Sequence, residues 1–185
     1  MSQPQRPWGA EPFERLYREH VELVRRTARK LGGPTIEVDD VAQEVFLVAA
    51  RRLDRFDPRT AQLSTWLYGI TLNVVRGLRR RARSRIREQS DDDPRVETTT
   101  ETTSETIDRV LVRDAWNIAE RVLGQMSPAK RDAFVLAEFA GLSCAEIGAL
   151  AGVKEETIWS RLHYARREFR ALLGRHTAAD ARAAA

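Results

Sequence analysis

The carboxylates of Asp39, Asp40 and Glu44 stand close together in the sequence and could bind a cation or work as an acid and base pair. No histidine or further carboxylate lies nearby at ligand spacing, and the chain has no Glu-x-x-His pair of the di-metal type. The single cysteine, Cys144, cannot form an internal disulfide or hold a metal cluster alone. A solvated helix start explains the three carboxylates more simply. We therefore predict no catalytic residue, no metal site and no cofactor.

A run of arginines, with no acidic residue from Arg76 through Arg87, could bind phosphate groups. Each such contact would release condensed counterions, so binding to a nucleic acid would depend on salt. A charged run is ordinarily a solvated face, but its concentration at a predicted helix end favours phosphate contacts. The run comprises Arg76, Arg79, Arg80, Arg81, Arg83, Arg85 and Arg87.

A helix-turn-helix is predicted between residues 143 and 172. Ser143 and Glu146 form a capping box for a short helix that runs to about Leu150, with Cys144 as a small filler at its second position. A tight turn at Gly152 leads to a long helix that begins near Lys154. The second helix of such a motif normally enters the major groove of DNA. Its core face carries Ile158, Leu162, Ala165, Phe169 and Leu172, and the opposite side carries Glu156, Ser160, His163, Tyr164 and Arg167, with Trp159, Arg166 and Arg170 on the flanks.

Three further helices must position the arginine run and the carboxylates. Apolar spacing predicts a first helix over 13–31 that stops at a Gly-Gly-Pro sequence, with His20 as a spectator. A second helix follows the Asp39-Asp40 pair, which can cap it, and reaches Phe56. After a loop over 57–62, Ser64 can cap a third helix over 65–78 that is apolar on most sides and is therefore buried deeply or covered by a partner.

Composition divides the rest of the chain. Residues 88–106 are acidic and rich in threonine, lack apolar periodicity, and are predicted to be a flexible linker. Helical patterns resume at Ile107 and again after Ser127-Pro128, a cap followed by a proline at the first helical position. The fold class is therefore all-α, with two small helical domains at 13–87 and 107–173, a loose tail at 1–12 and a frayed end at 174–185.

The totals restrict the compartment and the partners. The 185 residues hold 31 Lys and Arg against 27 Asp and Glu, and this net charge of +4 favours polyanions only weakly. No apolar run is long enough to span a bilayer, and residues 1–12 do not resemble a signal peptide. We expect a cytoplasmic protein without membrane insertion.

Residues 39–46 (DDVAQEVF), 64–70 (STWLYGI) and Asn73 resemble region two of the bacterial extracytoplasmic-function (ECF) sigma factors of the sigma-70 family. The helix-turn-helix resembles region four of the same family. The resemblance implies a factor that binds core RNA polymerase, recognises the −35 and −10 promoter elements and promotes DNA melting. It implies that region two binds the β′ clamp helices, that the polymerase β flap is a further contact, and that an anti-sigma factor holds the protein inactive. It also implies no enzymatic activity of its own.

The resemblance assigns site residues by position. It places polymerase contacts at Asp39, Asp40, Gln43, Glu44 and Leu47, and contacts to −10 DNA at Trp66, Asn73, Arg76, Arg79 and Arg80. It places contacts to −35 DNA at Glu156, Thr157, Trp159, Ser160, His163, Tyr164 and Arg167. The loop at 57–62 corresponds to the segment that captures a flipped base, and the linker to a segment that threads through the polymerase.

Other interpretations remain open at this stage. Trp159 and Tyr164 stand where the family commonly has basic residues, so they could make apolar or stacking contacts to bases or could pack on a neighbouring helix. A stand-alone helix-turn-helix regulator would explain the second domain alone. A helical enzyme using Asp39, Asp40 and Glu44 would need a pocket and further ligands.

Overall fold

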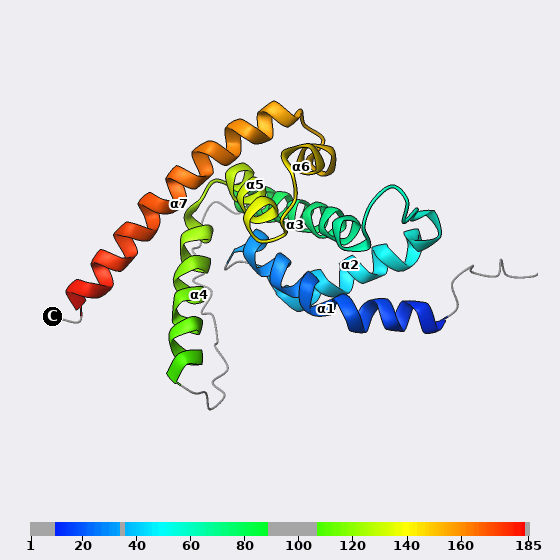
Figure 1. Cartoon of the computed structure of the whole chain (residues 1–185), viewed down its shortest axis with the longest axis horizontal. Coiled ribbons are helices and arrows are strands. Elements are labelled where there is room, and N and C mark those ends of the chain that lie inside the picture. The colour runs from blue at the N-terminus through cyan, green and yellow to red at the C-terminus, as the bar shows by residue number, and fades with distance from the viewer. Residues whose placement is uncertain (1–9, 34–35, 89–106, 184–185) are drawn as a thin grey trace, which may run out of the picture.

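The computed structural model describes residues 10–33, 36–88 and 107–183. Within these ranges the regular secondary structure is entirely helical, as predicted (Figure 1). Two groups of helices are visible, one from each side of residues 89–106. The predicted linker falls almost wholly in that range, which lies outside the described residues, as does most of the predicted N-terminal tail.

The first domain is a bundle of α1 (Ala10–Gly32), α2 (Val38–Arg52) and α3 (Leu63–Glu88), with the short 3-10 helix η1 (Leu53–Arg55) after α2. Each helix packs against the other two, because each has an apolar face at helical spacing. The buried core includes Val24, Leu31, Val45, Phe46, Leu67, Leu72 and Val75. This core presents the outer side of α2 to solvent.

Three details of α1 and α2 differ from the prediction. Helix α2 ends at Arg52, where the 3-10 helix η1 follows it, and does not reach Phe56. Helix α1 begins at Ala10, before the expected Phe13. The N-cap of α2 is Glu37, without a side-chain cap hydrogen bond, and the Asp39-Asp40 pair lies inside the first turn. The prediction that this pair caps the helix is therefore wrong. Acidic side chains in a first turn still stabilise it, because they face the positive end of the helix dipole.

Helix α3 is longer than predicted at both ends. The Trp66 backbone N–H donates to the Gln62 carbonyl at 3.1 Å, so Leu63 already belongs to the helix and Ser64 is not its cap. At the other end α3 continues beyond Leu78 through the arginine run to Glu88. Arginine is a good helix former, so the run extends the helix instead of ending it. Its side chains consequently point to several sides of α3.

The second domain consists of α4 (Ile107–Gln125), α5 (Pro128–Glu138), α6 (Cys144–Ala151) and α7 (Glu155–Ala183). Helix α5 begins as predicted, with Ser127 at the N-cap position and Pro128 in the first turn, although the Ser127 side chain makes no cap hydrogen bond. Helices α5, α6 and α4 all pack on α7. The apolar face of α7 is buried at Ile158, Leu162 and Ala165, as predicted.

The helix-turn-helix of α6 and α7 is confirmed in detail. The Ser143 hydroxyl accepts from the Glu146 backbone N–H at 3.2 Å, and the Glu146 carboxylate accepts from the Ser143 backbone N–H at 2.8 Å. These hydrogen bonds lower the pKa of the exposed Glu146 carboxyl below its ordinary value. Gly152 ends α6 in the left-handed region, at φ 67°. Cys144 is the first residue of α6, not the second, and is half-buried.

The predicted frayed end after residue 173 is wrong for residues 174–183, which continue α7. Alanine has the highest intrinsic helix propensity, so an alanine-rich segment without an apolar face can extend an existing helix. The side chains of His176 and Gln125 are hydrogen-bonded at 2.7 Å, which ties this extension to α4.

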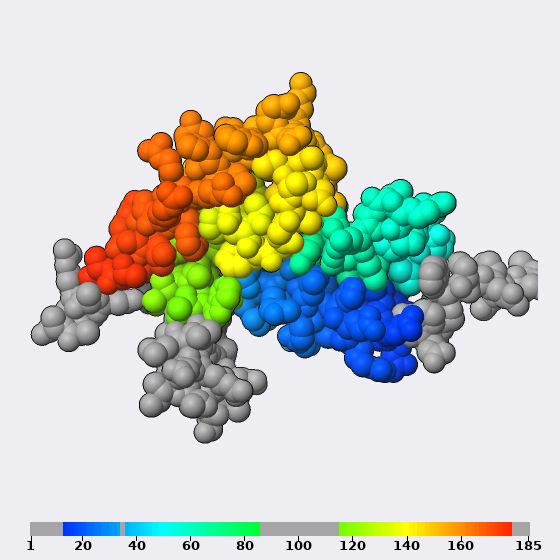
Figure 2. Space-filling model, viewed as in Figure 1, coloured from blue at the N-terminus to red at the C-terminus, as the bar shows by residue number. Residues whose placement is uncertain are grey.

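The two domains are packed against one another. Helix α1 contacts α4 and α5, and α3 contacts α6. In the space-filling view, α5 and α6 of the second domain lie directly on the first domain (Figure 2). A Cβ added at Gly69 of α3 would come within 2.7 Å of the Leu150 side chain of α6. The expected burial of α3 is thus supplied mainly by α1 and α2, and Leu150 of α6 covers Gly69.

Two glycine substitutions should shift stability in opposite directions. Gly152→Ala places a Cβ on a residue with φ 67° and should lower the free energy of unfolding by roughly 1 kcal/mol, although no atom obstructs that Cβ. Gly174→Ala lies within α7, also in open space, and should raise it by about 0.5–1 kcal/mol. Urea denaturation followed by circular dichroism measures both. Equal effects of the two substitutions would contradict the assigned backbone conformations.

Candidate functional site

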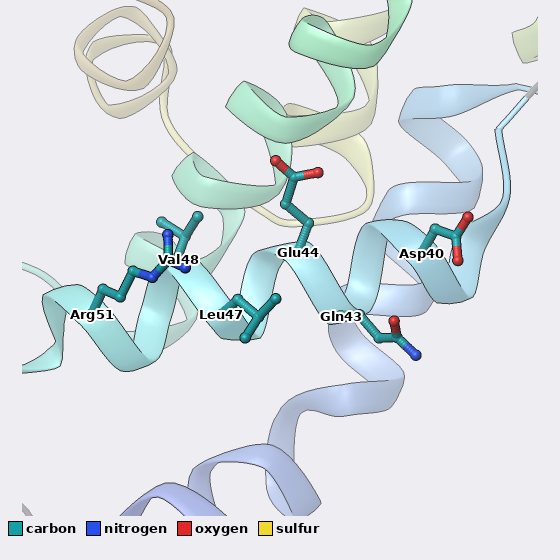
Figure 3. Close-up of a pocket in the computed structure, with 6 residues that line it drawn as sticks. All are labelled: Asp40, Gln43, Glu44, Leu47, Val48 and Arg51. Carbon is teal, nitrogen blue, oxygen red and sulfur yellow. The ribbon is translucent and has the colours of Figure 1, made fainter.

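The exposed side of α2 forms a shallow open depression. Figure 3 shows its lining residues arrayed along the helix. Leu47 is 58% exposed in this depression, and the carboxylates of Asp40 and Glu44 precede it along α2. The depression thus combines negative charge with exposed apolar surface, a pattern that suits a protein partner. It is lined by Asp40, Gln43, Glu44, Leu47, Val48 and Arg51.

Asp39, which was assigned to the same site, lies apart from this depression. Its carboxylate forms an ion pair with Arg25 Nε of α1 at 2.9 Å. Successive residues of a helix point about 100° apart, so Asp39 and Asp40 face different directions. The structure therefore groups four of the five predicted polymerase contacts, Asp40, Gln43, Glu44 and Leu47.

The predicted −10 contacts divide between two sides of α3. Trp66, Asn73 and Arg80 follow one another at seven-residue intervals, about two helical turns, and therefore share one side. Asn73 and Arg80 are exposed. Trp66 is half-buried, with its ring 5.2 Å from that of Phe56 at the start of the loop. This side is available to a ligand.

Arg76 and Arg79 lie on the other side and face the second domain. Arg76 Nε donates to Asp132 Oδ2 at 2.8 Å, and Arg79 Nη2 donates to Asp132 Oδ1 at 2.6 Å. Their side chains are 27% and 12% exposed, so neither is free on the surface in this conformation. The sequence could not reveal this pairing, because Asp132 lies in a different domain.

The loop at 57–62 is an ordered turn. The Asp57 carboxylate accepts from the Arg59 backbone N–H at 2.9 Å and pairs with its guanidinium at 3.0 Å. The hydrogen bonds from Arg59 hold the pKa of the Asp57 carboxyl below its usual range. Pro58 and Thr60 are exposed. The loop therefore has a defined shape before any ligand arrives.

The outward side of α7 is open to solvent at all but one of the predicted recognition residues. Trp159 is 67% and Tyr164 53% exposed, so the alternative that they pack on a neighbouring helix is wrong. Trp159 lines a second shallow depression with Glu155, Glu156 and Ser160. Thr157 is half-buried, and the remaining predicted residues, Glu156, Ser160, His163 and Arg167, are exposed.

Residues that the sequence analysis did not select connect the domains. Lys30 Nζ of α1 lies 4.7 Å from the Trp116 ring centroid and 5.2 Å from that of Phe139. Burial lowers the pKa of Lys30 and raises that of Glu120. Arg131 of α5 donates to carbonyls of both domains. The sequence offered one signal for Arg131, a charged residue within a helix that was predicted from its apolar residues.

Among the described residues, no group of three or more His, Cys, Asp or Glu side chains is placed so that it could hold a metal ion. None of the described helices is long and apolar enough to cross a membrane.

Comparisons with known proteins agree with this geometry. The family model described as Sigma-70 region 2 matches residues 16–85, and the one described as Sigma-70, region 4 matches residues 116–169. These matches span α1–α3 and most of the second domain. A stand-alone helix-turn-helix regulator would not carry the first of them, so that alternative is set aside.

Curated relatives are similar over nearly the whole chain. The chain is 33% identical over 174 residues to the ECF RNA polymerase sigma factor SigE of Mycolicibacterium smegmatis, covering 93% of this chain and 65% of SigE. It is 31% identical over 160 residues to the ECF RNA polymerase sigma factor SigL of Mycobacterium tuberculosis, covering 85% of this chain and 86% of SigL.

Solved structures show the same fold. The sigma factor RpoE, in complex with the anti-sigma factor NepR from Bartonella quintana, has a TM-score of 0.73 at 20% identity, covering 89% of this chain and 98% of RpoE. CnrH, in complex with the cytosolic domain of CnrY, has a TM-score of 0.59 at 26% identity, covering 90% of each chain. The matched family regions, the curated relatives and the helical architecture lead to one conclusion: this chain belongs to the ECF RNA polymerase sigma factors.

Proposed function

We propose that this sigma factor binds core RNA polymerase through the α2 depression and directs it to promoters by reading the −10 element with α3 and the −35 element with α7. The polymerase supplies the phosphodiester chemistry, so the factor is not itself an enzyme, and it acts where the polymerase does, in the cytoplasm. The observation that carries the proposal is the exposure, in one chain, of both the α2 depression and the recognition side of α7.

Leu47 and its acidic neighbours support a contact with polymerase. An exposed leucine loses unfavourable contact with water when a partner covers it. Asp40 and Glu44 add negative charge that would attract a basic partner and fix its orientation. The β′ clamp helices of the polymerase are the partner that the family resemblance implies.

The exposed side of α3 and the adjacent loop support a contact with the −10 element. Arg80 can bind a phosphate and Asn73 can hydrogen-bond a base edge. The Phe56–Trp66 ring pair lies where the loop joins η1 to α3, and aromatic rings offer stacking surfaces to unpaired bases. Such contacts would offset the cost of unstacking a base during melting.

The exposed residues of α7 support a contact with the −35 element. Trp159 and Tyr164 offer apolar area, and Tyr164 also offers a hydroxyl, on the side that a helix-turn-helix presents to the major groove. Apolar contacts there favour the thymine methyl group, while Arg167 can bind a phosphate. Since the sigma factor RpoE is in complex with the anti-sigma factor NepR, an anti-sigma partner is part of the proposal. A contact to the polymerase β flap is also part of it, because the family resemblance implies one.

The double substitution Gln43→Ala, Glu44→Ala should weaken binding to core polymerase by about tenfold or more, because it removes polar contacts at the centre of the α2 depression. Fluorescence anisotropy with labelled protein and purified core enzyme measures the affinity. Tyr164→Ala, in the other domain, is the matched control and should leave core affinity unchanged. Unchanged core affinity of the double variant would remove Gln43 and Glu44 from the interface.

Tyr164→Ala should reduce initiation about tenfold on promoter fragments that the holoenzyme selects from a random library, because each good base contact contributes roughly 1–3 kcal/mol. The loss should disappear on fragments whose −35 sequence is scrambled, where no specific contact remains. In vitro transcription measures both values, and an equal loss on both templates would place Tyr164 outside base recognition.

Arg80→Ala should reduce holoenzyme binding to promoter DNA at every sequence and lower the slope of log affinity against log salt by about one, because one phosphate contact is lost. Nitrocellulose filter binding at several salt concentrations measures the slope. Arg15→Ala, an exposed arginine of α1 outside the proposed binding surfaces, is the control for a general loss of positive charge and should leave the DNA salt slope unaltered. A slope that Arg80→Ala does not change would exclude a phosphate contact at Arg80.

A further inference from the structure

One carboxylate of the second domain neutralises two arginines of the first. Asp132 on α5 is 4% exposed and bridges Arg76 and Arg79 of α3 at 2.8 and 2.6 Å. The same two arginines are predicted contacts of −10 DNA. A carboxylate and a phosphate are chemically equivalent partners for a guanidinium, and each accepts the same N–H donors. Asp132 therefore takes up one N–H donor of each arginine that a DNA phosphate could otherwise use.

Other contacts hold the domains in this arrangement. Arg131, adjacent to Asp132, donates from Nη1 to the carbonyl oxygens of Leu31 and Gly32 at the end of α1, each at 3.2 Å. On the other side of the contact, Leu150 of α6 covers Gly69 of α3. These two contacts help to fix the relative position of the domains, so they lower the ordering cost of bringing Asp132 to its arginines.

The ion-pair cluster has properties that would let a polyanion replace Asp132. One carboxylate faces two guanidinium groups, so the cluster keeps a net positive charge that attracts a polyanion. Within the described part of the chain, the buried Arg79 Nη1 has no hydrogen-bond partner. An unsatisfied buried donor costs free energy, and a phosphate with several acceptor oxygens could satisfy it.

We propose that Asp132 is an intramolecular latch that closes the −10 surface of the free protein by taking the place of DNA phosphate on Arg76 and Arg79. This proposal rests on the proposed function of α3. In the closed form the chain exposes the α2 depression and the α7 recognition side. Arg76 and Arg79 stay paired with Asp132 and cannot bind DNA. Separation of the domains, as DNA or polymerase binds, frees both arginines at once.

The first measurement is the distance between the domains in the free, full-length protein. Cys144 is replaced by serine, and spin labels are attached to cysteines introduced at Asp54 and Ala171, both exposed and one in each domain. Pulsed electron spin resonance then reports the distribution of distances. The closed protein should give a single narrow distribution.

Two variants should open the protein by different physical routes. Asp132→Asn leaves the guanidinium groups of Arg76 and Arg79 buried without a counter-charge, and opening hydrates them. Gly69→Leu keeps every charge but drives a side chain into Leu150, whose Cδ2 lies 2.7 Å from the position of a Cβ at Gly69. Both should lengthen and broaden the distance distribution.

Each variant has a matched control on the same helix. Glu138→Gln neutralises a carboxylate of α5 that pairs with Arg166 inside the second domain at 2.8 Å, so the domains should stay closed. Gly77→Leu adds the same side chain to α3 at a position where no atom lies within 4 Å of the added Cβ. Circular dichroism should show that all four variants retain their helices.

The second measurement is the affinity of the same free proteins for a fluorescein-labelled DNA duplex of random sequence, at several salt concentrations. If the wild-type protein is roughly nine-tenths closed, opening should raise its apparent affinity about tenfold, because only the open fraction binds through α3. Two additional phosphate contacts should steepen the salt dependence by up to about two. Gly69→Leu should show both effects although its charge is unchanged.

The outcomes separate this proposal from the function on which it rests. Longer distances together with tighter DNA binding in both variants, and neither change in the controls, support the latch. An unchanged distance in Asp132→Asn, or an opened Gly69→Leu that binds DNA no more tightly, overturns it. Failure of the proposed function would appear elsewhere, as an absence of core polymerase binding by the wild-type protein, whatever the distance between the domains.

Discussion

The arrangement of this protein depends on the buried guanidinium of Arg131. Burial lowers its pKa, and a buried cation is tolerated only where hydrogen-bond acceptors surround it. Its Nη2 donates to the carbonyls of Gly124 and Met126 in the second domain, and its Nη1 donates to the end of α1 in the first. The last carbonyls of a helix lack intrahelical partners and carry partial negative charge. One side chain thus completes the turn between α4 and α5 and joins the two domains.

That junction explains features that otherwise look unrelated. Gly33, at φ 74°, has no room for a side chain, since an added Cβ would lie 2.7 Å from Arg131 Nη1. Lys30, one turn earlier, lies over the rings of Trp116 and Phe139 from the second domain. The end of α1 is therefore a contact surface, and its glycines do more than stop a helix. The ion pairs of Asp132 follow from the same placement, because its neighbour Arg131 fixes the position of α5.

Local chemistry made much of this structure predictable from the sequence. The Ser143–Glu146 capping box and the tight turn at Gly152 each depend on a few adjacent residues, and both were predicted correctly. A helix after the Glu37–Asp40 segment was also predicted correctly, although its cap and its end were not. The ends of α3 and α7 were missed because arginine and alanine extend helices without an apolar pattern. The pairing of Asp132 with Arg76 could not be foreseen, since the two residues are 56 positions apart and no local rule links them.

The continuity of α7 has a consequence for hydrogen exchange. Its 29 residues extend about 43 Å at 1.5 Å per residue. Among its side chains up to residue 178, whose burial the structure describes, the buried ones are Ile158, Leu162 and Ala165, all in the first half. Amide protons there can exchange only when the second domain opens, whereas those of the distal half are protected by the helix itself and the His176 contact. A single continuous helix thus contains two kinetic regimes, a slowly exchanging anchor beside α6 and a rapidly exchanging extension.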